Sequence, residues 1–109
     1  MAHMNKHSEE SFDSVRLRAG QGDTVAQYNL GDMYRNGRGV SQDDKEAFRW
    51  FRTAADQGLA NAQNQLGLMY QNGRGVPQDG KEAARWYRLA ADQGFAEAQR
   101  LASEWKPKK

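Results

Sequence analysis

Several residue types are missing or scarce in this chain of 109 residues, and each absence excludes a class of protein. There is no cysteine, which excludes disulfide bonds, a thiol nucleophile and thiolate metal ligands. Proline and histidine occur only twice each. No apolar run approaches the roughly 18 residues of a membrane-spanning helix. The net charge of +2 comes from interspersed charges, so nucleic acid is not the expected partner.

Both ends of the chain are expected to lie outside the folded part. The opening Met1-Ala2-His3-Met4 is typical of a cloning remnant, so residues 1–7 are expected to be such a remnant and disordered. Residues 106–109 are expected to be a solvated basic tail. Residues 8–105 are then predicted to form one domain.

Glycine is abundant, with 11 residues, and an internal repeat accounts for it. Residues 26–61 and 62–97 align without gaps at a period of 36, and 25 of the 36 positions are identical. Residues 8–22 match the second half of the unit, and residues 96–105 match its first half. The chain therefore contains a half repeat, two full repeats and a closing half repeat.

Each half of the unit is predicted to be a helix, because apolar residues recur at helical spacing in 24–36 and in 43–57. Asp43 and Glu46 have the spacing of a capping box at the start of the second helix. The Asn-Gly-x-Gly stretch that begins at Asn36 ends the first helix. A helix pair of this size cannot bury its own apolar face. The sequence therefore predicts an all-α fold, an α-solenoid of about six helices in stacked antiparallel pairs.

The unit resembles a known family. The first copy carries Ala26, Leu30, Gly31, Tyr34, Gly37, Gly39, Val40, Asp43, Trp50 and Gly58, and the second copy carries the same residues 36 positions later. This pattern resembles the Sel-one-like repeat (SLR), a relative of the tetratricopeptide repeat. The resemblance implies a non-catalytic adaptor that binds other proteins and needs no cofactor.

The two half repeats depart from the pattern. Ser14 stands where the full repeats have a tryptophan, and Ala102, Ser103 and Lys106 replace a leucine, a glycine and a tyrosine. The last half is therefore expected to be a closing cap. The recurring tryptophans, Trp50 and Trp86, are expected in the core or as wedges between helices, and Trp105 is expected to seal the C-terminal end.

The positions that differ between the two copies predict a binding surface. Positions 28, 32 and 35 share one helix face because they are spaced i, i+4, i+7. Packing like that of tetratricopeptide repeats places this face on the concave surface. The predicted partner-binding residues are Val25, Tyr28, Asp32, Arg35, Asn36, Asn61, Asn64, Leu68, Gln71, Asn72, Glu97, Arg100 and Glu104. Their mixture of apolar, charged and amide groups suits a peptide, although ordinary solvated helix faces would look similar.

Other differing positions lie in the second helix of the unit. Phe48, Phe51 and Thr53 stand opposite Ala84, Tyr87 and Leu89 of the second copy. They are expected to adjust packing between layers instead of contacting a ligand.

Signals of chemistry are weak. Ser103 and Lys106 have the Ser-x-x-Lys spacing of enzymes that react with β-lactams, without the accompanying motifs. His7 and Glu10 are too few to hold a metal ion. The Gly-Arg-Gly loops at Arg38 and Arg74 are interpreted as turns. No enzyme activity, metal or cofactor is expected.

Two alternatives to the protein-binding adaptor stay open. The first is a small-molecule or cell-wall ligand binder, for a β-lactam or a glycan, with at most weak hydrolase activity. The second is self-association through the ends of the solenoid. The pattern is bacterial in character, and a periplasmic or secreted location is favoured over the cytoplasm.

Overall fold

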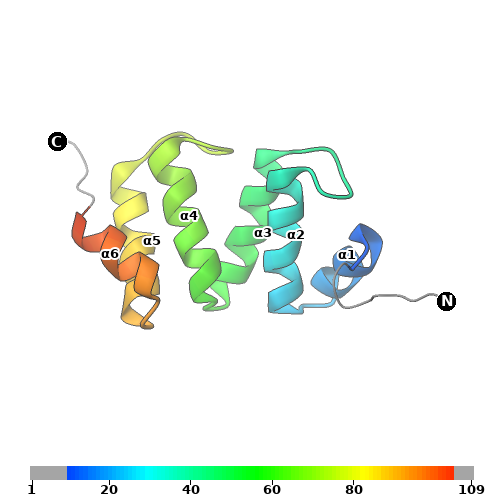
Figure 1. Cartoon of the computed structure of the whole chain (residues 1–109), viewed down its shortest axis with the longest axis horizontal. Coiled ribbons are helices and arrows are strands. Elements are labelled where there is room, and N and C mark those ends of the chain that lie inside the picture. The colour runs from blue at the N-terminus through cyan, green and yellow to red at the C-terminus, as the bar shows by residue number, and fades with distance from the viewer. Residues whose placement is uncertain (1–9, 105–109) are drawn as a thin grey trace.

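The computed structural model describes residues 10–104, and this part of the chain forms six α-helices without a strand. They are α1 (Phe12–Gly20), α2 (Thr24–Asn36), α3 (Asp44–Asp56), α4 (Ala60–Asn72), α5 (Gly80–Asp92) and α6 (Ala96–Glu104). Figure 1 shows them side by side in chain order, from α1 at one end to α6 at the other, with consecutive helices antiparallel. The array measures 57 × 27 × 22 Å. The predicted α-solenoid is confirmed. The predictions for residues 1–7, Trp105 and residues 106–109 lie outside the described residues.

Aspartate side chains begin the second helix of each unit. Asp43 accepts the backbone N–H of Glu46 at 3.1 Å, and Asp79 accepts that of Glu82 at 3.1 Å. In a capping box, the side chain of Glu46 would accept the backbone N–H of Asp43. Here that N–H donates to the Tyr34 carbonyl instead, at 2.9 Å. The cap therefore also ties α3 to the end of α2.

Left-handed glycines end the first helix of each unit, as the sequence predicts. Gly37 has φ 69° and Gly73 has φ 67°, a backbone region that side chains with a Cβ disfavour. Their N–H groups donate to the carbonyls of Met33 and Met69, which satisfies an acceptor at each helix end.

A second pair of glycines allows the two helices of a unit to approach closely. A Cβ on Gly31 would lie 2.8 Å from the Phe51 ring, and a Cβ on Gly67 would lie 2.5 Å from the Tyr87 ring. Both rings are completely buried. The aromatic ring of α3 or α5 therefore lies directly on the backbone of α2 or α4, and only glycine fits beneath it.

The cores of the two units are continuous. Trp50 packs on a cluster centred on Val15 and Leu30, and Trp86 packs on a cluster centred on Phe51 and Leu66. Each tryptophan thus packs against the preceding layer, as expected for Trp50 and Trp86.

Glutamine side chains join successive layers at the turns. Gln57 donates to Gln27 at 2.8 Å, and Gln27 donates to the Ala19 carbonyl at 3.1 Å. The second unit repeats this arrangement, with Gln93 donating to Gln63 at 2.9 Å and Gln63 donating to the Ala55 carbonyl at 3.2 Å. Because buried amides need partners, these bonds explain why the glutamines recur in both copies.

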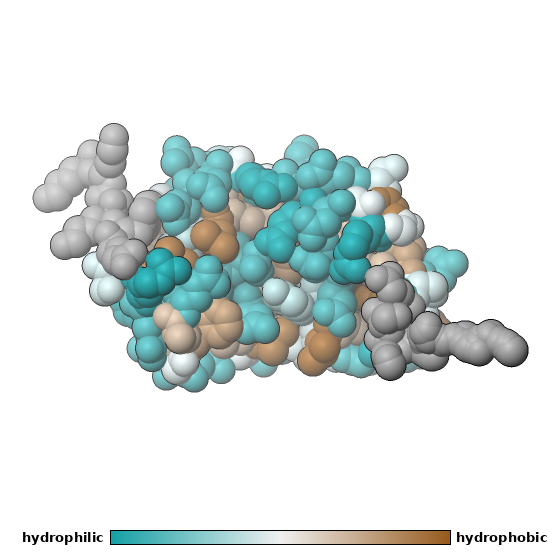
Figure 2. Space-filling model, viewed as in Figure 1, coloured by the Kyte–Doolittle hydropathy of each residue, from teal (hydrophilic) through white to brown (hydrophobic). Residues whose placement is uncertain are grey.

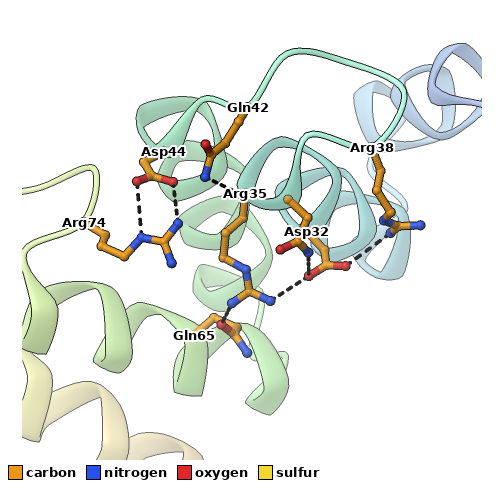
Figure 3. A network of polar contacts seen from close by, with 8 residues as sticks. Asp32, Arg35, Arg38, Gln42, Asp44, Gln65 and Arg74 are labelled. Carbon is orange, nitrogen blue, oxygen red and sulfur yellow. Dashed lines mark hydrogen bonds and ion pairs between the residues drawn. The ribbon is translucent and has the colours of Figure 1, made fainter.

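The loop of the second unit packs on the first. The Arg74 guanidinium donates to the Asp44 carboxylate at 2.9 and 3.2 Å (Figure 3). A Cβ on Gly75 would lie 2.3 Å from the Asp44 carbonyl oxygen. In the first unit, Arg38 instead pairs with Asp32 at 3.2 Å. Both loop arginines therefore bond within the chain, in agreement with loops that act as turns.

The close approach of helices generates a prediction. Gly67→Ala should lower the midpoint of thermal unfolding, followed by circular dichroism. Overpacking against the Tyr87 ring costs about 1–3 kcal/mol, more than the roughly 1 kcal/mol that alanine adds to a helix. Gly20→Ala is the matched control, since no atom lies within 4 Å of its Cβ. Equal midpoints for the two variants would contradict the packing account.

Candidate interaction surface

The predicted partner-binding residues lie on α2, α4 and α6, the first helix of each unit. We call the face that carries them the A-helix surface. Side chains bridge its three helices, because Arg35 of α2 donates to Gln65 of α4, and Asn64 of α4 donates to Glu97 of α6 at 3.2 Å. The three helices therefore present one continuous surface.

Asp32 organises the α2 part of this surface (Figure 3). Its carboxylate accepts from Arg35 at 2.7 Å, from Asn36 at 3.1 Å and from Arg38 at 3.2 Å. The Arg35 guanidinium also lies 5.6 Å from the centre of the Phe51 ring, a cation–π distance. The Asp32 and Arg35 side chains are 25% and 23% exposed, so both are held in place yet reachable from solvent.

Tyr28 lies beside this network and is half-buried. Its ring centre is 5.4 Å from that of Phe51. Burial is the main cause that raises the pKa of Tyr28, and the negative charges of Asp32 and Glu97 add to it.

The α4 part is less charged. Leu68 and Gln71 are half-buried, and the Tyr87 hydroxyl donates to the Gln71 side chain. Burial, followed by the charge of Glu97, raises the pKa of Tyr87 to about 12. The surface thus changes from an ion-pair network on α2 to an apolar and amide patch on α4.

The structure sorts the predicted residues by exposure. The exposed ones are Val25, Asn36, Asn61, Asn72, Glu97 and Arg100, and the half-buried ones are Tyr28, Asp32, Arg35, Leu68 and Gln71. Asn64 is fully buried, so it does not line the surface as predicted; its side chain lies beneath Glu97 and donates to it. The Glu104 side chain lies outside the described residues.

Gln65 belongs to the surface and was not among the predicted residues. It accepts a hydrogen bond from Arg35 across the contact between α2 and α4. Gln65 differs from its equivalent in the other copy, Asn29. The difference between copies that selected positions 28 and 32 was therefore also present at this position.

The described residues show little that could perform chemistry. No three metal-binding side chains gather within residues 10–103. The Ser103 hydroxyl donates to the Arg100 carbonyl in its own helix at 3.0 Å, and Lys106 lies outside the described residues. None of the described helices is long and apolar enough to cross a membrane.

Fold and surface together define an α-solenoid repeat protein with a shared face on the first helices. The sequence profile of the Sel1 repeat matches residues 24–59 and 60–95. This chain belongs to the Sel1 repeat family, in agreement with its resemblance to Sel-one-like repeats. Proteins of this family are commonly non-catalytic scaffolds for protein interactions.

Solved structures agree with the family assignment. A Sel1 repeat protein from Oxalobacter formigenes is 41% identical with a TM-score of 0.82, and the match covers 84% of this chain and 68% of that one. A protective antigen of uropathogenic Escherichia coli with an SLR fold is 48% identical with a TM-score of 0.79. That match covers 80% of this chain and 19% of the antigen.

The cysteine-rich protein B of Helicobacter pylori shares the fold, with a TM-score of 0.78 and 23% identity over 83% of this chain and 68% of that one. No curated protein matches this chain. The structural relatives are thus bacterial repeat proteins.

The buried tyrosine predicts a pH dependence. Because folding raises the pKa of Tyr87 from 10.0 to about 12, its stabilisation is complete below pH 10 and is lost as the pH rises towards 12. Urea unfolding between pH 9 and pH 12 should show a steeper loss of stability in the wild type than in Tyr87→Phe. Parallel pH profiles would contradict the shift.

Proposed function

We propose that this chain is a non-catalytic adaptor that binds a protein or peptide segment on the A-helix surface. The observation that carries the proposal is the location of the differences between the two copies. Tyr28, Asp32 and Arg35 share one face of α2, while most of the core, the caps and the glutamine bonds are formed by residues that are identical in the two copies. Three of the differing positions thus gather where a partner could be recognised.

The composition of the surface supports a protein ligand. Tyr28 and Leu68 offer partly exposed apolar area, and aromatic residues are frequent anchors in protein interfaces. Around them stand the carboxylate and guanidinium groups of Asp32 and Arg35, which are already held by hydrogen bonds. Preorganised polar groups lose little conformational freedom on binding, which favours affinity.

The N-terminal end of the array is less suited to contact. Arg18 occupies the position at which the full repeats have the buried residues Ala54 and Ala90. It bonds to Glu10 at 2.9 Å and to Asp23 at 2.8 Å, so a charged side chain stands where the full repeats bury an alanine. We therefore rank self-association through the ends below binding on the A-helix surface.

The bacterial relatives support a bacterial origin, and we propose a periplasmic or secreted location. We also propose that residues 8–105 act as a single domain, since each helix packs on its neighbours along the chain and the cores of successive units are continuous.

Affinity capture tests the proposed function. Immobilised wild type is compared with a fourfold variant, Tyr28→Ala, Asp32→Ala, Arg35→Glu and Leu68→Ala, on the lysate of a bacterium that encodes the chain. The wild type should retain a protein that the variant loses. Once that protein is purified, the variant should bind it at least about tenfold more weakly than the wild type does, since each truncated anchor costs about 1 kcal/mol or more.

The control carries Thr53→Ala and Arg88→Ala, two exposed residues on the second helices α3 and α5. It should capture the same protein as the wild type, and circular dichroism should show that both variants are folded. Equal capture by the fourfold variant would move the site away from the A-helix surface. If instead a β-lactam or a glycan fragment raised the unfolding temperature and no protein were retained, the chain would be a small-molecule binder.

A further inference from the structure

One polar group beneath the A-helix surface has no hydrogen-bond partner in the part of the chain that the structure describes. Asn64 is completely buried, and its Nδ2 donates to Oε1 of Glu97 at 3.2 Å, whereas its Oδ1 accepts no hydrogen bond. Because a carboxylate only accepts, this bond fixes which end of the amide faces Glu97. The unused Oδ1 and the Nδ2 that contacts Glu97 are bonded to the same carbon atom of Asn64. Oδ1 therefore lies near the Glu97 carboxylate.

Glu97 has no cationic partner among the residues that the structure describes. It is exposed, and none of the ion pairs within the described residues includes it. Its charge raises the pKa values of both Tyr28 and Tyr87, so the carboxylate acts towards α2 and α5 and not only along its own helix. A negative charge and an unsatisfied acceptor therefore stand together where α4 meets α6.

The fold does not require this pair. In the preceding unit, Tyr28 occupies the position of Asn64, and Asn61 occupies that of Glu97. There α2 and α4 pack without an equivalent buried amide, and a tyrosine ring against Phe51 takes its place. A buried acceptor without a partner lowers stability, so a purely structural role does not explain its presence.

We propose that Glu97 and Asn64 form a subsite for a lysine or arginine side chain of the segment bound on the A-helix surface. The inference rests on the proposed function and specifies the chemistry of its ligand. Lysine and arginine side chains only donate hydrogen bonds, which matches two acceptors, one of them charged. Because Glu97 is exposed, its side chain can turn to meet the cation and let the Asn64 oxygen accept the second hydrogen bond.

An acidic side chain at the same place would meet the carboxylate and an amide oxygen, both unfavourable. The subsite therefore selects for a positive charge.

Selection from a random peptide library displayed on phage tests the proposal. The same library is selected on the wild type, on Glu97→Gln, on Glu97→Lys and on Asp92→Asn. The last variant is the matched control, because it removes one exposed negative charge from α5, away from the A-helix surface. Circular dichroism and thermal unfolding first establish that each variant is folded.

Peptides selected on the wild type and on Asp92→Asn should share one position enriched in lysine or arginine. Glu97→Gln should bind a wild-type-selected peptide about tenfold more weakly, as expected for one charge-assisted hydrogen bond, and Glu97→Lys should select aspartate or glutamate there. Asn64→Ala should bind the same peptide more weakly than the wild type does. The two proteins should bind equally well an otherwise identical peptide that has alanine at the basic position.

Failures of the two proposals differ. Peptides enriched without a basic position, or bound equally by wild type and Glu97→Gln, would overturn the subsite and leave the protein-binding function intact. No enrichment on the folded wild type would count against both proposals. Equal loss of affinity in Glu97→Gln and Asp92→Asn would mean that only the overall charge of the protein matters. That result would also overturn the subsite.

Discussion

The contact between an aromatic ring and a glycine backbone within each unit sets the spacing on which the rest of the structure depends. The Phe51 ring lies on Gly31 and the Tyr87 ring on Gly67, at distances that no larger residue would permit. This approach brings α2 to α3 and α4 to α5, and the tryptophan that precedes each ring in the sequence packs against the layer before it. The glutamine bonds then fix the turns between layers. Each interaction occurs twice, 36 residues apart, so the layers stack in a constant manner.

A constant stack leaves one set of positions free. The identical residues of the two copies are mostly occupied with packing, caps and turns, and three of the four differences in the first helix, at positions 28, 32 and 35, share one face. In the first copy this face carries the network around Asp32, and in the second it carries Leu68 and Gln71. Figure 2 shows that the molecular face seen in Figure 1 is mostly hydrophilic with scattered apolar residues.

The sequence alone was sufficient for the architecture, because a period of 36 with two helical patterns admits few other folds. It also placed the helix ends, since Asp43, Gly37 and their equivalents act through local chemistry. Side-chain burial on the A-helix surface was harder to predict. Asn64 has the periodicity of a surface residue, yet α6 covers it and Glu97 accepts its hydrogen bond. Contacts between residues that are 30 positions apart, such as Arg35 and Gln65, depend on the angle between layers. The repeat pattern of the sequence does not specify that angle.

The central claim is that the residues by which the A-helix surface recognises a partner can be exchanged while the stack stays intact, so that recognition and stacking allow experimental separation. Transplanting the second copy's surface onto the first tests it most directly, with the triple variant Tyr28→Asn, Asp32→Leu and Arg35→Gln. The measurement is thermal unfolding by circular dichroism together with affinity for a ligand that binds the wild type. Our account predicts native helix content, a single cooperative transition and lost or altered binding. An unfolded variant, or a folded one that binds the ligand unchanged, would contradict the separation.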